Sequence, residues 1–134
     1  MIKSQITEEL SLARKHLDYS YNRVVKILFD RELDEEQLEK LESFSSRFAR
    51  FSEIAISKYF RVLVLERDPA FRGSIIDLLN HAEKHGWISS KDQWLRIREL
   101  RNVAAHEYSA ADYKKLYQEL IRLTPVLLQL STQL

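Results

Sequence analysis

Three side chains that could do chemistry stand within eight residues near the end of a predicted helix: Arg101, His106 and Tyr108. An arginine keeps its charge at physiological pH and can hold a phosphate through two parallel hydrogen bonds. A histidine titrates near neutrality, so it can give or take a proton during a reaction. Together, Arg101 and His106 suit cleavage of a phosphodiester without a metal ion.

The spacing of these residues limits how they can act together. At about 100° per residue, Arg101 and Tyr108 fall within roughly 20° of one another on a helix, and Asn102 shares a face with His106. Arg101 and His106 would point roughly 140° apart on an ideal helix. They could still meet at one substrate if the helix loosens near His106, or if a second subunit completes the site.

A less specific explanation fits the same residues. A histidine beside a tyrosine is common at a helix C-terminus, because the carbonyl groups there favour positive charge. Arg101 could equally be a solvated surface residue in a chain that is rich in arginine. Spacing alone does not decide between these interpretations.

The segments on either side of the motif predict helices. Upstream, apolar residues recur three or four positions apart, as on one helix face: Trp94, Ile97, Leu100 and Ala104. Downstream, residues 109–112 resemble a capping box, so a last helix is expected over about 110–130, kinked or interrupted at Pro125.

Three further helices are expected before the motif. The first covers about Gln5 to Phe29, and the second runs from a capping box at Asp34 to about Leu65, so the two should form an antiparallel hairpin. The third begins at Asp68-Pro69 and ends at Gly86. These elements predict an all-α, antiparallel bundle of four to five helices, with residues 1–134 as a single domain.

The composition limits the classes of partner that the chain can be expected to bind. Charged residues make up 31% of the 134 residues and balance to a formal net charge of +1, so no global attraction to nucleic acid or membrane is implied. The chain has no cysteine for disulfides or thiolate metal sites. It also lacks a long apolar run and a signal-peptide pattern, so we expect a cytoplasmic protein without membrane contact.

Any binding of RNA must therefore use local basic patches. Arg96, Arg98 and Arg101 form the densest arginine cluster, and Arg98 and Arg101 are neighbours on a helix. Arg47 and Arg50 form another pair, three residues apart. Such pairs can line a phosphate track or simply form a solvated face.

A pair of histidines elsewhere in the chain, His81 and His85, superficially resembles metal ligands on one helix face. A zinc site needs further ligands, and none stands at a suitable spacing. The helix dipole accounts for two histidines in a last turn. We therefore expect neither a metal site nor a cofactor.

The pattern of arginine, four residues, histidine, one residue and tyrosine resembles the signature of HEPN-domain toxins, the HepT-like partners of minimal nucleotidyltransferase antitoxins. Arg101, His106 and Tyr108 stand at its three fixed positions, and Asn102 is the polar residue often found after that arginine. The resemblance covers the whole chain as a helical architecture, and these eight residues as a motif.

This resemblance implies a homodimer in which two motif helices face each other across a cleft. It implies a metal-independent endoribonuclease toxin, in which His106 is the general acid or base, Arg101 holds the scissile phosphate and Asn102 supports them. The expected products carry a 2′,3′-cyclic phosphate and a 5′-hydroxyl. The resemblance further implies that a cognate nucleotidyltransferase antitoxin attaches AMP to Tyr108 and blocks the cleft.

Two other functions remain open at this stage. The chain could be a non-catalytic, substrate-binding subunit of a nucleotidyltransferase, which would use the same basic cleft without His106 as an acid. It could also be a purely structural helical interaction module.

Overall fold

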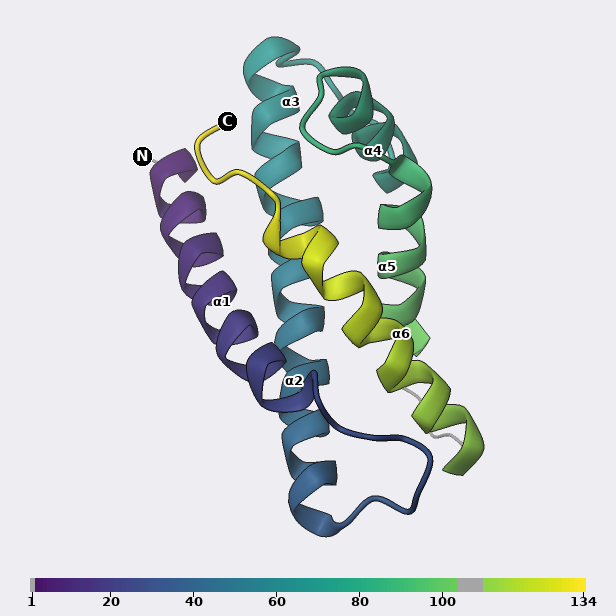
Figure 1. The fold of residues 1–134 in the computed structure, drawn as a ribbon. Helices are drawn as coiled ribbons and strands as arrows, with labels where there is room; N and C mark the ends of the chain where they lie inside the picture. The colour runs from purple at the N-terminus through teal and green to yellow at the C-terminus, as the bar shows by residue number, and fades with distance from the viewer. Residues whose placement is uncertain (1, 104–109) are drawn as a thin grey trace.

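The computed structural model describes residues 2–103 and 110–134, which form helices and their connections without a strand (Figure 1). In chain order the elements are α1 (Ile2–Val24), α2 (Glu35–Glu53), the π-helix η1 (Ile54–Phe60), α3 (Arg61–Arg67), α4 (Ile75–Lys84), α5 (Lys91–Val103) and α6 (Ala110–Leu128). Because α2, η1 and α3 follow one another without a break, they form one long rod, and the described chain consists of five helical rods. The predicted all-α bundle of four to five helices is confirmed.

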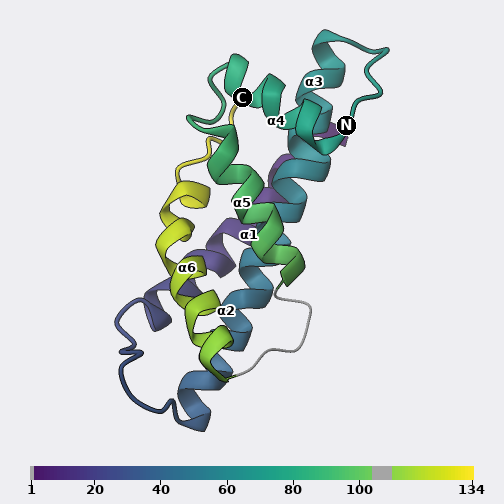
Figure 2. The same cartoon turned by 90° about the vertical axis from the view of Figure 1, so that its right-hand side faces the viewer.

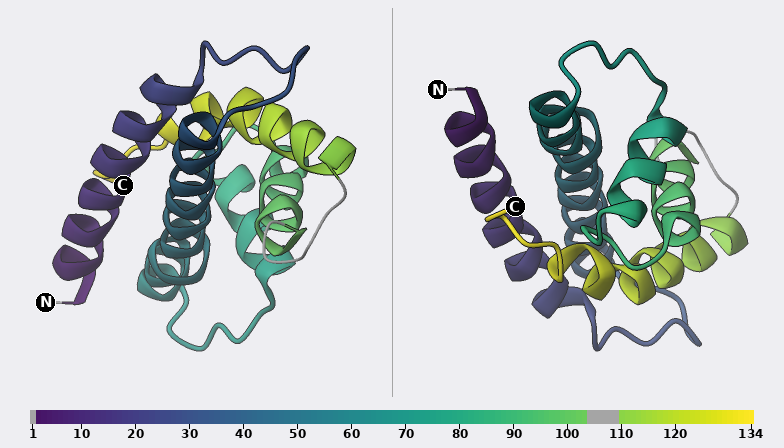
Figure 3. Two further views of the ribbon diagram at one scale, coloured as in Figure 1. Left: turned by 90° about the horizontal axis from the view of Figure 1, so that it is seen from below. Right: turned by 90° about the horizontal axis from the view of Figure 1, so that it is seen from above.

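Four of the five rods pack as a row of three with a fourth laid across it. α1 and α2 run antiparallel, and α5 and α6 lie side by side (Figure 2). The end views show α2 between α1 and α5, with α6 crossing one face of all three (Figure 3). Within the described chain, the face of α2 that points away from α6 is therefore left without a covering helix.

Aromatic and leucine side chains fill the centre of the bundle. Phe44, Phe48 and Phe51 of α2 are fully buried, as are Leu10 and Leu17 of α1. Burial of each such side chain contributes about 1.5–3 kcal/mol. None of the described helices combines the length and the apolarity that crossing a bilayer requires.

The long rod departs from its predicted apolar stripe after Tyr59. A π-helix closes its hydrogen bonds over one more residue than an α-helix, so it rotates the buried face of the chain that follows. Phe60, Leu63 and Val64 are buried, whereas Val62 and Leu65, which a regular helix would bury, are only half-buried.

The predicted end of the first helix is wrong, because α1 stops at Val24 rather than near Phe29. Val25 and Leu28 are exposed, so extending the helix would bury no further apolar surface. Helix stability in proteins comes mainly from such packing, and the β-branched pair Val24-Val25 has a low helix propensity.

The third helix also begins later than predicted. Ser74 and Asp77 form a complete capping box before Ile75, whereas Asp68 accepts a hydrogen bond from the Ala70 amide at 3.2 Å within a turn. Local side-chain bonding at Asp68 thus competes with helix initiation there. The predicted end is confirmed, since Gly86 follows the helix with a φ of 76°.

Pro125 does not interrupt α6, which continues to Leu128. Its missing amide removes one hydrogen bond near the end of the helix. The last turn is held from outside, because Arg14 of α1 donates to the carbonyl of Leu128 at 2.7 Å and also to that of Leu130. These carbonyls would otherwise lack partners at the helix end.

A bidentate ion pair joins α5 to α6. Arg96 donates from Nε and Nη2 to the two carboxylate oxygens of Glu119, at 2.7 and 2.6 Å, and from Nη1 to Glu99 at 2.7 Å. The hydrogen bond from Arg96 lowers the pKa of Glu119 below its ordinary value. The ionised carboxylate is therefore favoured in the folded protein.

We predict that Glu119→Gln lowers the free energy of unfolding at pH 7 by about 1 kcal/mol. Since the folded-state pKa of Glu119 is depressed, its contribution is present above about pH 4.3 and is lost as the pH falls through the lowered value. Urea unfolding at pH 7 and at lower pH should show the difference between variant and wild type shrinking in acid. Glu36→Gln, which breaks the exposed Lys40 pair, is the control and should change stability by less than about 0.5 kcal/mol. A loss that does not depend on pH would contradict this account.

Candidate active site

Arg101 lies in the last turn of α5, at the edge of the buried core. Trp94, Ile97 and Leu100 are at most 2% exposed and fix the inward face of the helix. Arg101 follows Trp94 by seven residues, so it points within about 20° of the same direction. Its side chain therefore faces the long rod at the point where the core gives way to solvent.

The π-helix η1, part of the long rod, packs against the inward face of α5. The ring of Phe60 meets Trp94 edge-on with centroids 5.3 Å apart, and it stacks on Trp87 at 6.2 Å. Inside α-helices, π turns occur frequently at functional sites. This one begins directly after Glu53, the last residue of α2.

Glu53 forms an ion pair with Arg101. The distance from Arg101 Nη2 to Glu53 Oε2 is 2.9 Å, and the two side chains are 32% and 43% exposed. Arg101 Nη1 also donates to Asn102 Oδ1 at 3.3 Å, and the Ser57 hydroxyl donates to Glu53 Oε1 at 3.1 Å. The guanidinium is thus oriented on one side and open to solvent on the other, as an arginine that receives a phosphate must be.

A comparison with protein families shows which family this chain resembles. The chain matches the family described as Ribonuclease HepT-like over residues 31–134, from the connection before α2 to beyond α6. The chain belongs to the HepT-like ribonuclease family. No curated protein and no solved structure gives a significant match. The predicted resemblance of the chain to HepT-like proteins is thereby confirmed.

The structure describes only part of the motif of this HepT-like chain. Arg101 and Asn102 lie beside each other and share a hydrogen bond. His106 and Tyr108, the predicted acid–base residue and modification site, lie outside the described residues. Their roles stay predictions from the sequence.

Glu53 is the residue of this site that the sequence did not reveal. It stands in a long helix among many other carboxylates, and no local spacing marks it. Its contact with Arg101 joins two helices that are far apart in the chain. Only the packing of α5 on the long rod could have identified it.

The other arginines predicted to bind phosphate lie in three different settings. Arg96 is fully engaged between Glu119 and Glu99, so a phosphate would have to displace a carboxylate from it. Within the described chain, Arg98 forms no hydrogen bond or ion pair, and it stands one turn before Arg101. Arg47 and Arg50 are on α2, where Arg47 faces α1 and donates to the Ser20 hydroxyl at 2.8 Å.

The histidine pair of α4 belongs to a ladder of rings. The rings of His81 and His85 stack at 5.9 Å, and His85 stacks on Trp87 at 5.2 Å. Desolvation, followed by the charge of Arg67, lowers the pKa of His85, which favours its neutral form. Across residues 2–103 and 110–134, no three His, Asp or Glu side chains are grouped so that they could hold a metal ion.

Proposed function

We propose that this protein is the toxin of a toxin–antitoxin pair and cleaves RNA as a metal-independent endoribonuclease. The observation that carries the proposal is Arg101, oriented by Glu53 and Asn102 yet open to solvent, within a match to a ribonuclease family. Membership of that family supports action on RNA, and the arrangement of Arg101 supports phosphate binding.

In the proposed reaction the 2′-oxygen of the ribose attacks the adjacent phosphorus, and the bond from phosphorus to the 5′-oxygen breaks. His106 takes the proton from the 2′-hydroxyl or gives one to the leaving 5′-oxygen. Arg101 binds the scissile phosphate and stabilises the charge that builds on its oxygens in the transition state. The products are a 2′,3′-cyclic phosphate and a 5′-hydroxyl.

The proposal includes a homodimer. On an ideal helix Arg101 and His106 point roughly 140° apart, so a single straight helix cannot bring both to one phosphate. Two copies related by a two-fold axis would place each motif opposite its counterpart. The arginine of one copy and the histidine of the other can then serve the same substrate.

The first test of this function is RNA cleavage in excess chelator. Cleavage by the wild type should persist, and Arg101→Ala or His106→Ala should each lower the rate by about 100-fold or more, the scale for losing one electrostatic or acid–base group. Arg72→Ala, an exposed arginine in the α3–α4 connection, is the matched control and should cleave normally. Cleavage that stops with chelator and returns with a divalent ion would refute the mechanism. A folded His106→Ala protein with full activity would favour a binding subunit instead.

A second test concerns Glu53 as a positioning residue. Glu53→Ala should lower kcat about tenfold with little change in KM, because a loosely held Arg101 meets the transition state less well. Glu53→Gln should lose less, since its amide oxygen can still accept a hydrogen bond from Arg101. Glu42→Ala, an exposed carboxylate on the same helix, should have no effect.

The decisive measurement for Glu53 is a double-mutant cycle with Arg101. If Glu53 acts through Arg101, Glu53→Ala should change nothing further in the Arg101→Ala background. An equal loss in both backgrounds would show that Glu53 supports the fold rather than the arginine.

A third test concerns regulation by the antitoxin. We propose that the phenol oxygen of Tyr108 attacks the α-phosphorus of ATP in the antitoxin, with release of pyrophosphate and loss of the phenol proton to a base there. The attached AMP carries a phosphate that competes with RNA for Arg101.

Incubation with a cognate nucleotidyltransferase, ATP and magnesium should give an AMP adduct on Tyr108, detected by mass spectrometry, and should stop RNA cleavage. Tyr108→Phe should stay unmodified, whereas Tyr113→Phe should be modified and inhibited. An adduct that leaves cleavage unchanged would disprove the competition.

A further inference from the structure

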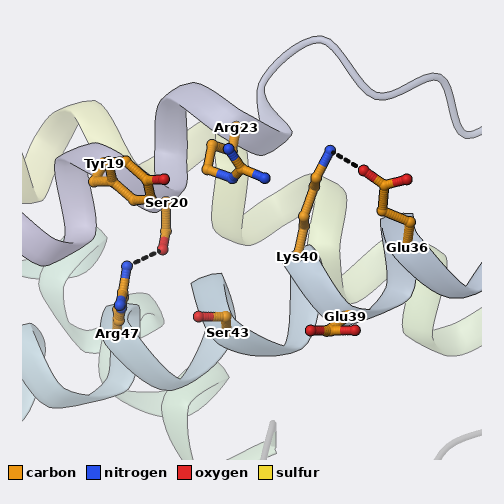
Figure 4. A pocket seen from close by; sticks show the side chains of 8 residues that line it. All are labelled: Tyr19, Ser20, Arg23, Glu36, Glu39, Lys40, Ser43 and Arg47. Atoms are coloured by element: carbon orange, nitrogen blue, oxygen red, sulfur yellow. Dashed lines mark hydrogen bonds and ion pairs between the residues drawn. The ribbon is translucent and has the colours of Figure 1, made fainter.

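A groove between α1 and α2 is lined by basic side chains that the proposed cleavage site does not use. Its walls include Tyr19, Ser20 and Arg23 from α1 and Lys40, Ser43 and Arg47 from α2 (Figure 4). Its volume is about 240 Å³, below the roughly 300–1,000 Å³ of most small-molecule sites. A groove of this size suits a short segment of a polymer that passes through it. It suits an enclosed small molecule less well.

Two arginines from opposite walls converge on one exposed tyrosine. Arg23 and Arg47 lie 5.6 and 5.9 Å from the centre of the Tyr19 ring, which is 60% exposed. The electron-rich ring face offsets part of the repulsion between the two cations. Among the described residues neither arginine forms an ion pair with a carboxylate, so their charges are free to meet an anion.

Arg47 is held in a fixed position for this role. Its Nη1 donates to the Ser20 hydroxyl at 2.8 Å and to the His16 carbonyl at 3.3 Å. The remaining donors, on Nε and Nη2, have no hydrogen-bond partner within the described chain. An anchored guanidinium with free donors matches the two oxygens of a phosphate.

The carboxylates of the groove do not cancel this charge. Glu36 pairs with Lys40 at 3.1 Å on the exposed end of the groove (Figure 4). Glu39 is the other carboxylate along its wall. Three cations face two carboxylates, and the two arginines are the cations without a carboxylate partner in the described chain.

The groove connects to Arg101 across the uncovered face of α2. Arg47, Arg50 and Glu53 follow one another at three-residue spacing, which is about 4.5 Å per step along the helix axis. Arg50 is exposed and forms no hydrogen bond or ion pair with the described residues. Basic side chains therefore lead from the groove to Glu53, the partner of Arg101.

We infer that the groove between α1 and α2 binds phosphates of single-stranded RNA that flank the cleaved bond. Arg23 and Arg47 are the phosphate contacts, and Arg50 lies on the path between them and Arg101. The inference rests on the proposed function, in which Arg101 holds the scissile phosphate. It adds a second binding site on the other side of α2 and makes the enzyme prefer longer strands.

The binding test uses a labelled single strand of about 16 nucleotides, fully 2′-O-methylated so that it cannot be cleaved, titrated by fluorescence anisotropy at several salt concentrations. Each lost phosphate contact on a single strand should reduce the slope of log affinity against log salt by about 0.7. Arg23→Ala and Arg47→Ala should each show this change and bind about fivefold more weakly. Arg72→Ala is the control, because this exposed arginine belongs to the connection between α3 and α4. That connection stands at the opposite end of the bundle from the α1–α2 connection (Figure 1).

Misfolding cannot account for the result at Arg23, which donates no hydrogen bond to the described chain. Unchanged slopes in both groove variants, or no RNA binding by the wild type, would overturn the inference. Loss of nucleotidyltransferase binding with RNA binding unchanged would show that the groove is a protein interface, and would overturn it too.

A cleavage test separates this inference from the proposed function. For a cleavable strand of about 16 nucleotides, Arg23→Ala should raise KM about fivefold and leave kcat unchanged. A dinucleotide, whose single phosphate must occupy Arg101, should show no difference between variant and wild type. A protein that binds the long strand through Arg23 and Arg47 but cleaves nothing would refute the proposed function and keep the groove. Cleavage with equal KM in variant and wild type on the long strand would do the reverse.

Discussion

The rings of Phe60 and Trp94, 5.3 Å apart, join the long rod to α5, and the rest of the site depends on this contact. α5 runs antiparallel to the rod (Figure 1). Seven residues before Phe60 stands Glu53, and seven residues after Trp94 stands Arg101, so the two helices meet again at this ion pair. A buried aromatic contact, worth about 0.5–1.5 kcal/mol beyond its area, sets the register at which an exposed ion pair can form. The ion pair alone, half in water, is too weak to do so.

Two arginines of α5 show how the same side chain serves two purposes. Arg96 gives three hydrogen bonds to two carboxylates, and the hydrogen bond with Glu119 raises its pKa further above an already high value. Among the residues that the structure describes, Arg101 has one carboxylate partner and one amide partner. A phosphate that approaches Arg101 has to compete with the exposed ion pair to Glu53, which contributes about 0–1 kcal/mol. A phosphate that approaches Arg96 would have to break the bidentate ion pair with Glu119 that joins α5 to α6.

Features set by neighbouring residues could be predicted from the sequence. The capping box at Asp34 and Gln37 and the glycine end at Gly86 follow from local backbone chemistry, and both are present. The inward face of α5 follows from the spacing of Trp94, Ile97 and Leu100.

Features that arise between distant segments could not be predicted. The π-helix leaves no local mark, because its residues also suit an α-helix, and its extra residue per turn moved the buried face from Val62 and Leu65 to Leu63 and Val64. Glu53 was hidden for the same reason, since only the packing of α5 selects it among the carboxylates of α2.

Glu53 also links substrate and inhibitor in the proposed function. The formal net charge of the chain is only +1, so RNA is held by local groups rather than by the field of the whole molecule. At Arg101 the local field is further reduced by Glu53, and any phosphate must offset that carboxylate. An isolated phosphodiester gains little from such an exchange, whereas a strand that is also held at a second basic site brings its scissile phosphate to Arg101 at a high effective concentration. In the proposed regulation, an AMP group attached to Tyr108 would gain the same advantage through its covalent bond. Glu53 thus favours tethered phosphates over free ones, and on the proposed function a covalent modification would therefore compete effectively with a long RNA.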